Sequence, residues 1–210
     1  MLHGFELRYT KMKNNSFENN MPSEKREMQL LDENELSLNL IEAQYLLKNT
    51  RDQNNAKSVL VLVNGIELAG KGESVKQLRE WVDPRYLRVK ADPPMMLDQK
   101  QTFWQPYASS IPAEGQIMVM FGNWYSDLLV TALHVSKPLT ETVFDAYIED
   151  MRAFEQDLKN NHVDVIKVWF DLSWKSLQKR LDNMDPSEVH WHKLHGLDWR
   201  NKKQYDNVQK

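Results

Sequence analysis

The chain has 210 residues, of which 41% are apolar and 27% charged, and this suits one globular α/β domain with a substantial core. Its formal net charge of -3 gives no general attraction to nucleic acid or to an anionic membrane, so a polyanion must be held by a local basic patch. Cysteine is absent, which excludes disulfides and thiolate metal sites, and we expect a cytoplasmic protein with no nucleic-acid or membrane partner.

The first part of the chain predicts an arm, a helix and a buried strand. Residues 1–30 are polar and rich in asparagine, which predicts a disordered arm and places the folded domain at 31–210. Asp32 and Glu35 have the spacing of a capping box, and the apolar residues that follow predict a helix. Residues 59–63, Val-Leu-Val-Leu-Val, are apolar at every position, as in the interior strands of a parallel sheet.

The rest of the chain alternates between helical and strand-like segments. Further strands are predicted at 86–89, 117–121 and 163–170, and helices after Gly65, around 103–107, at 125–135 and at 141–160. Strands separated by helices favour right-handed crossovers and therefore a parallel, doubly wound sheet. From Trp174 onward the sequence becomes polar and basic.

A glycine-rich segment follows the strand predicted at 59–63 and opens the next helix. It reads Gly-Ile-Glu-Leu-Ala-Gly-Lys-Gly-Glu from Gly65, which is the spacing of a P-loop. In such a loop successive backbone N–H groups curl around phosphate oxygens at a helix N-terminus. We therefore expect a P-loop NTPase-like fold. The candidate phosphate-binding residues of the loop are Gly65, Ala69, Gly70, Lys71, Gly72 and Glu73.

Two residues set this loop apart from those of ordinary P-loop kinases. Gly72 replaces the Ser or Thr whose hydroxyl ligates magnesium, which disfavours a conventional ATP-dependent small-molecule kinase. Glu67 places a carboxylate inside the loop, which repels phosphate unless a cation lies between them or the carboxyl group is a base or a metal ligand. We take Glu67 and Lys71 as the candidate catalytic residues and Glu67 as a weak candidate metal ligand.

The loop resembles that of the family 2 polyphosphate kinases, which reads Gly-x-Asp-x-x-Gly-Lys-Gly. The similarity continues through five further segments in the same order and covers roughly residues 35–208. These segments are Trp81-Val82-Asp83-Pro84-Arg85, Ala91-Asp92-Pro93, Phe103-Trp104, Ile111-Pro112 and Trp124-Tyr125. The chain looks most like the N-terminal copy of a two-copy polyphosphate:AMP phosphotransferase.

The resemblance implies a three-layer α/β sandwich that moves a phosphoryl group between inorganic polyphosphate and a nucleotide, with conversion of AMP to ADP as the reaction expected of this chain. It also implies Mg²⁺ as cofactor, an adenine nucleotide as partner, a second homologous domain and a homo-oligomer. In the basic C-terminal lid, about 174–205, Arg180 and Lys202 fall at basic positions of the family.

One departure from the family bears on activity. Where the family has Asp-Arg-Ser before its Trp-Tyr pair, this chain has Phe121-Gly122-Asn123, so the second acidic metal ligand and an arginine are missing. Phosphoryl transfer depends on neutralising phosphate charge, so we expect a weak enzyme or a silent binding or scaffolding domain. Restoring both residues, Phe121→Asp with Gly122→Arg, is predicted to raise the rate if the pocket is otherwise preserved.

Two other groups of residues are candidates for a metal site and a nucleobase-binding site. His190, His192 and His195 suggest a metal tract, but no carboxylate accompanies them at helical spacing, and a solvated or stacking role is favoured. Four aromatic residues could stack on a nucleobase, although core packing is the commoner role on helices and strand ends. These are Trp104, Tyr107, Trp124 and Tyr125.

Overall fold

The computed structural model describes residues 32–51, 56–98, 100–134, 139–185 and 197–209. The predicted arm at 1–30 lies outside these residues. In chain order the elements are α1 (Glu33–Asn49), β1 (Ser58–Gly65), α2 (Lys71–Trp81), β2 (Leu87–Lys90), the 3-10 helix η1 (Gln105–Ser110), β3 (Ile117–Met120), α3 (Trp124–Ala132), α4 (Glu141–Asn160), β4 (Val163–Phe170), α5 (Trp174–Asp182) and α6 (Lys202–Val208). Within the described part of the chain, no helix is long and apolar enough to cross a membrane.

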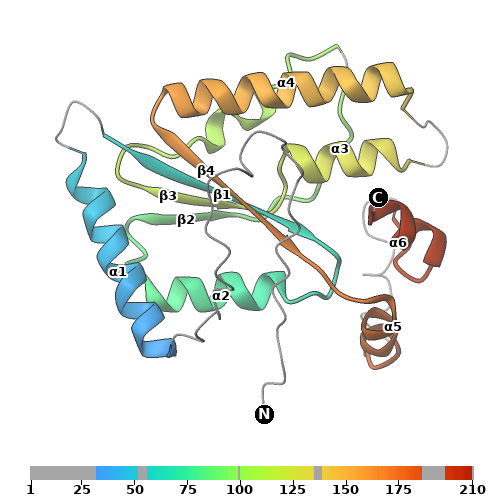
Figure 1. Ribbon diagram of the computed structural model, residues 1–210, viewed down its shortest axis with the longest axis horizontal. Helices are drawn as coiled ribbons and strands as arrows, with labels where there is room; N and C mark the ends of the chain where they lie inside the picture. The colour runs from blue at the N-terminus through green and yellow to red at the C-terminus, as the bar shows by residue number, and fades with distance from the viewer. Residues whose placement is uncertain (1–31, 52–55, 99, 135–138, 186–196, 210) are drawn as a thin grey trace, which may run out of the picture.

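The four strands form one parallel sheet in the order β2-β3-β1-β4. β1 lies between β3 and β4, which confirms the prediction of an interior strand. Helices α3 and α4 lie on one face of the sheet and α1 and α2 on the other (Figure 1). Helices α5 and α6 lie beyond the carboxyl ends of β1 and β4. The three-layer α/β architecture with a parallel sheet is therefore confirmed.

The core explains why β1 is apolar at every position. Leu60 and Leu62 pack toward α3 and α4, whereas Val63 joins the cluster on the side of α2. Successive strand side chains point to opposite faces, so a strand covered on both faces must be apolar throughout. A third cluster joins Ile66 and Ala69, which follow β1, to the C-terminal helices, and so the segment after β1 is held from outside the sheet.

The predicted capping box of α1 is not formed. Asp32 is the N-cap residue but makes no side-chain cap bond, and its carboxylate accepts a hydrogen bond from Asn34 Nδ2 instead (3.3 Å). Tertiary contacts hold the helix, because the buried Gln44 donates to the Asp83 carbonyl (2.9 Å) and accepts from the Asp83 N–H (2.8 Å). Long-range pairing with another segment thus replaces the local cap.

Other boundaries differ by a few residues for local reasons. The helix predicted at 125–135 is α3, which begins at Trp124 because Asn123 and Ser126 form a reciprocal capping box. The helix expected around 103–107 is the short η1, with a proline in its first turn. The strand predicted at 86–89 is β2, one residue later. The helix predicted at 141–160 and the strand predicted at 163–170 are α4 and β4, and both match their predicted limits.

A candidate phosphate-binding site

The segment between β1 and α2 has the backbone of a phosphate loop. Gly65 (φ 123°), Leu68 (φ 61°) and Gly70 (φ 94°) all lie in the left-handed region, so the chain turns sharply at three places. A Cβ atom at Gly65 would stand 2.1 Å from the Phe170 carbonyl oxygen, so glycine is required there. Because α2 begins at Lys71, the N–H groups of its first turn have no partner within the helix and are free to bind an anion.

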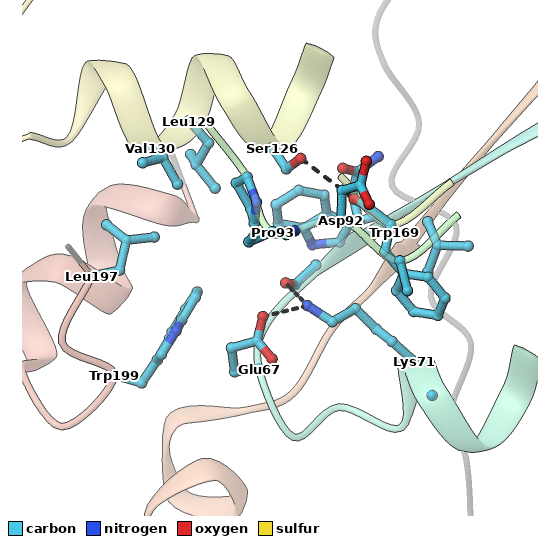
Figure 2. Close-up of a pocket in the computed structure, with 17 residues that line it drawn as sticks. Glu67, Lys71, Asp92, Pro93, Ser126, Leu129, Val130, Trp169, Leu197 and Trp199 are labelled. Atoms are coloured by element: carbon cyan, nitrogen blue, oxygen red, sulfur yellow. Dashed lines mark hydrogen bonds and ion pairs between the residues drawn. The ribbon is translucent and has the colours of Figure 1, made fainter. Parts of the chain in front are cut away.

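Lys71 folds back over this loop. Its amine donates to Glu67 Oε1 (2.7 Å) and to the Gly65 carbonyl (3.0 Å), as Figure 2 shows. Lys71 is therefore the cation that neutralises Glu67, one of the alternatives that the sequence left open. A phosphate at this amine would interact with a positive charge that the Glu67 carboxylate already neutralises in part.

A cavity of about 560 Å³ opens above this ion pair. Its walls come from the carboxyl ends of β1 and β4, the residues that follow β2 and β3, the start of α2, one side of α3, and Leu197 and Trp199. Trp169 and Trp199 lie on opposite sides of the Glu67–Lys71 pair (Figure 2). Asp92 also lines the cavity, and its carboxylate is paired with Lys90 (3.2 Å). The site thus combines a phosphate cradle with an apolar, aromatic wall.

The predicted loop residues are only partly directed at this cavity. Gly65, Glu67, Lys71 and Gly72 line it. Ala69, Gly70 and Glu73 do not, and the Ala69 N–H already donates to the Ile66 carbonyl (3.3 Å). A Cβ atom at Gly72 would meet open space, so packing does not explain the missing hydroxyl.

The two predicted lid residues differ in their positions. Arg180 comes to the loop, because its guanidinium donates to the Leu68 carbonyl from α5. The amine of Lys202 is instead paired with Asp206 on its own helix (2.7 Å) and does not line the cavity. Arg180 therefore stays a candidate for phosphate binding, whereas the structure does not bring Lys202 to the site.

Phe121 and Gly122, which stand where the family has its second acidic ligand and an arginine, differ from the family in both chemistry and available space. Phe121 lines the cavity where the family has an aspartate. A Cβ atom at Gly122 would stand 2.4 Å from the Asp92 carbonyl oxygen and 3.3 Å from that of Pro93. The backbone after β2 therefore lies directly against Gly122 and leaves no room for an arginine. This corrects the predicted repair, which assumed that the surrounding pocket was preserved.

The acidic residues of the described part of the chain do not fit a magnesium site. They include no group of three or more Asp, Glu, His or Cys side chains that could hold a metal ion. Glu67 is engaged by Lys71 and Asp92 by Lys90, and Phe121 offers no oxygen at the second ligand position. Magnesium prefers carboxylate, phosphate and water oxygens, and of the two loop carboxylates only that of Glu67 lines the cavity.

A buried carboxylate in α3 holds the segment that covers Gly122. Asp127 accepts hydrogen bonds from Tyr107 Oη (2.7 Å) and from the Met95 N–H (2.9 Å). Thr131, one turn later, accepts from the Leu97 N–H (2.9 Å). Burial raises the pKa of Asp127 to about 6, although both hydrogen bonds act in the opposite direction. The carboxylate thus positions residues 95–97 at a cost in desolvation.

This arrangement predicts a specific dependence of stability on pH. Between its usual pKa of 3.8 and about 6, Asp127 binds more protons in the folded than in the unfolded state. Its contribution to the free energy of unfolding therefore falls as the pH rises through that window, by roughly 3 kcal/mol. Urea unfolding of the wild type and of Asp127→Asn from pH 4 to pH 7 measures it. Parallel profiles of the two proteins would contradict the assignment.

The aromatic residues at the site are not those that the sequence suggested. Tyr107 and Trp124 are buried in the core, and Tyr125 donates its hydroxyl to Glu155 (2.7 Å). Trp104 is 50% exposed but lines a different groove. Trp169 and Trp199 do line the cavity. Their sequence gives no signal of this, because Trp169 lies in the apolar run that ends β4 and Trp199 lies in a polar, basic segment. The three histidines at 190, 192 and 195 lie outside the described residues.

The sheet order, the glycine-rich loop at the end of β1 and the lysine that opens α2 define a P-loop α/β protein, and its candidate anion site lies at the carboxyl edge of the sheet. The family model "Polyphosphate kinase 2 (PPK2)" matches residues 24–210. The chain belongs to this family.

Relatives of known name agree with this assignment. The chain is 77% identical over 181 residues to "Polyphosphate:AMP phosphotransferase" of Acinetobacter johnsonii, covering 86% of this chain and 38% of the relative. It is 37% identical to the protein of the same name from Pseudomonas aeruginosa, covering 82% of this chain and 34% of the relative. The chain therefore spans little more than a third of these proteins.

Solved structures give the same family. The "putative polyphosphate kinase 2" from Pseudomonas aeruginosa aligns with a TM-score of 0.62 and 30% identity, over 84% of this chain and 35% of that one. The "Polyphosphate Kinase 2 from Arthrobacter aurescens" aligns with a TM-score of 0.67 and 25% identity, over 84% of this chain and 63% of that one.

Proposed function

We propose that this domain binds polyphosphate and an adenine nucleotide at the loop between β1 and α2, and transfers a phosphoryl group to AMP only slowly. The observation that carries the proposal is the contrast between the two halves of the cavity. One half keeps Lys71 and the left-handed loop, and the other presents Phe121 and a covered Gly122. Binding depends mainly on the first half, and transition-state stabilisation on both.

The chain's own residues support binding more than turnover. Lys71 and the first-turn N–H groups of α2 orient a phosphate, and Arg180 stands beside the loop from α5. The apolar wall of the cavity excludes water from the bound phosphate. In this family magnesium would supply charge neutralisation during transfer, but the acidic residues here fit it poorly, and we assign no step to it.

Formation of ADP from AMP and polyphosphate tests this proposal. The purified chain and the full-length Acinetobacter johnsonii relative are compared under identical conditions with Mg²⁺ present. Loss of one group that stabilises the transition state commonly lowers kcat about 10²- to 10³-fold. We expect at least that deficit for this chain. Turnover comparable to that of the relative, and abolished by Lys71→Ala, would overturn it.

The alternative is a domain that is entirely silent and retained for binding or scaffolding. The close approach of the Asp92 carbonyl to Gly122 favours it, because the site would have to open before a catalytic arginine could be accommodated. Polyphosphate binding with no ADP above background distinguishes this alternative from slow turnover. A second homologous domain remains part of the proposal, supported by the greater length of the relatives. The homo-oligomer stays a prediction.

A further inference from the structure

The two carboxylates in the wall of the cavity above the loop are both occupied by lysine amines. Among the described residues that line this cavity, only Glu67 and Asp92 carry a carboxylate. The Glu67 carboxylate is paired with Lys71 (2.7 Å). The Asp92 carboxylate is paired with Lys90, the last residue of β2 (3.2 Å). A divalent cation at either carboxylate would therefore have to compete with an amine that is already in place.

The uncharged side-chain oxygens in the same wall do not make up for this. The Ser126 hydroxyl belongs to the capping box of α3, where it accepts from the Asn123 N–H (3.0 Å) and donates to the Asn123 carbonyl (2.8 Å). The side-chain oxygen of Asn64 is buried away from solvent. Gly72 lacks the hydroxyl of an ordinary P-loop. Magnesium needs oxygen ligands in addition to phosphate and water, and the described wall offers none that is unoccupied.

Lys71 holds the position that a metal ion would need at Glu67. Its amine is fixed at two points, by the Glu67 carboxylate (2.7 Å) and by the Gly65 carbonyl (3.0 Å), and its side chain is only 15% exposed (Figure 2). A divalent cation at the same carboxylate would stand a few ångströms from this amine, and like charges at that distance repel. The amine and a metal ion are therefore alternatives at Glu67.

We infer that the loop binds the metal-free phosphate chain, and that Lys71 takes the place of a magnesium ion at Glu67. An ammonium group has three N–H donors, and two of them are used within the loop, so one is left for a phosphate oxygen. The N–H groups of the first turn of α2 supply the other donors. This inference rests on the proposed binding function and adds to it the form in which the ligand binds, which is the free anion and not its magnesium complex.

The linkage between magnesium and phosphate binding tests the inference without any measurement of activity. The wild type is titrated calorimetrically with tripolyphosphate in EDTA and in millimolar MgCl₂, with KCl added to match the ionic strength. A protein-free titration gives the share of tripolyphosphate that holds magnesium, and the Kd is calculated for the free anion. We expect this Kd to change less than about twofold, whereas a metal that couples the loop to the phosphate would change it about 5- to 150-fold.

Lys71→Ala is expected to gain a response to magnesium, because the substitution releases the Glu67 carboxylate. Its affinity is weaker throughout, but the Kd for the free anion should fall at least about fivefold when MgCl₂ is added. Lys71→Ala combined with Glu67→Gln is the matched control, since it lacks the amine and the carboxylate together and should show no response. AMP is the second probe, because its single phosphate holds magnesium weakly and needs little correction.

Three results overturn the inference. If the Kd of the wild type for the free anion falls about fivefold or more in MgCl₂, the metal displaces Lys71, and the proposed binding function stands without the inference. If Lys71→Ala responds to magnesium no more than the double variant, Glu67 is not the carboxylate for which amine and metal compete. A wild type that binds neither tripolyphosphate nor AMP in either buffer refutes the proposed binding function, and the inference fails with it.

Discussion

Lys71→Ala is expected to weaken the binding of a short polyphosphate about 10- to 100-fold. A hydrogen bond to a charged group contributes about 1.5–3 kcal/mol, which corresponds to a change of this size. The loss has a second cause, since Lys71 is the counter-ion of Glu67 (2.7 Å) and its removal leaves an unpaired carboxylate facing the bound phosphate. Isothermal titration at low ionic strength measures the effect, because high salt screens these charges.

Two control variants separate the causes. Lys159→Ala removes the same charge near the C-terminus of α4, at the amino edge of the sheet, and should leave the affinity unchanged. Lys71→Ala combined with Glu67→Gln should recover part of the loss, because the repulsive carboxylate is then gone. Equal polyphosphate affinity for the wild type and Lys71→Ala would show that the loop is not the anion site.

Gly122→Ala is expected to lower the free energy of unfolding by about 3 kcal/mol, toward the upper end of the cost of overpacking. The added Cβ would stand 2.4 Å from the Asp92 carbonyl oxygen, a backbone atom that cannot rotate away. The segment around it is also held by Asp127 and Thr131. Gly122→Arg should be at least as costly, so Phe121→Asp with Gly122→Arg is not expected to raise the rate of ADP formation.

Gly72→Ala is the matched control for this substitution. It adds the same methyl group at a glycine that lines the cavity, but its Cβ meets nothing within 4 Å, and alanine is the better helix former in α2. Its free energy of unfolding should be equal to or higher than that of the wild type in chemical denaturation. A stable Gly122→Ala, or a repaired double variant with faster turnover, would mean that residues 92–93 move away from Gly122 readily.

Local sequence predicts one part of the site and some elements of the fold. The phosphate loop was predictable because its conformation depends on local chemistry, namely glycines at positive φ between an apolar strand and a helix. Helix α4 and strand β4 were predictable for the same kind of reason, since period and capping residues define their ends. The capping box at Asp32 failed because the contact of Gln44 with Asp83 holds α1 without it.

The opposite wall of the cavity could not be predicted from local pattern. An ungapped match shows that Phe121 and Gly122 replace charged residues, but it does not show that the Asp92 carbonyl lies against Gly122. That contact requires β2 to lie beside β3 and the following segment to be held from α3. Trp169 joins the site only because β4 pairs with β1 in a register that sets it beside Asn64.

The sequence by itself determined that this protein is a parallel α/β domain with a phosphate loop, because strand period, glycine spacing and helix starts are encoded within a few neighbouring residues. Only the tertiary structure decided which side chains surround the loop and which of them are already paired. It paired Lys71 with Glu67, turned Lys202 toward Asp206 and, among the residues that the structure describes, left the Asn64 oxygen without a hydrogen-bond partner. The physical reason is that hydrogen bonds, ion pairs and close packing act over a few ångströms between segments far apart in the chain, and only the folded arrangement brings those segments together.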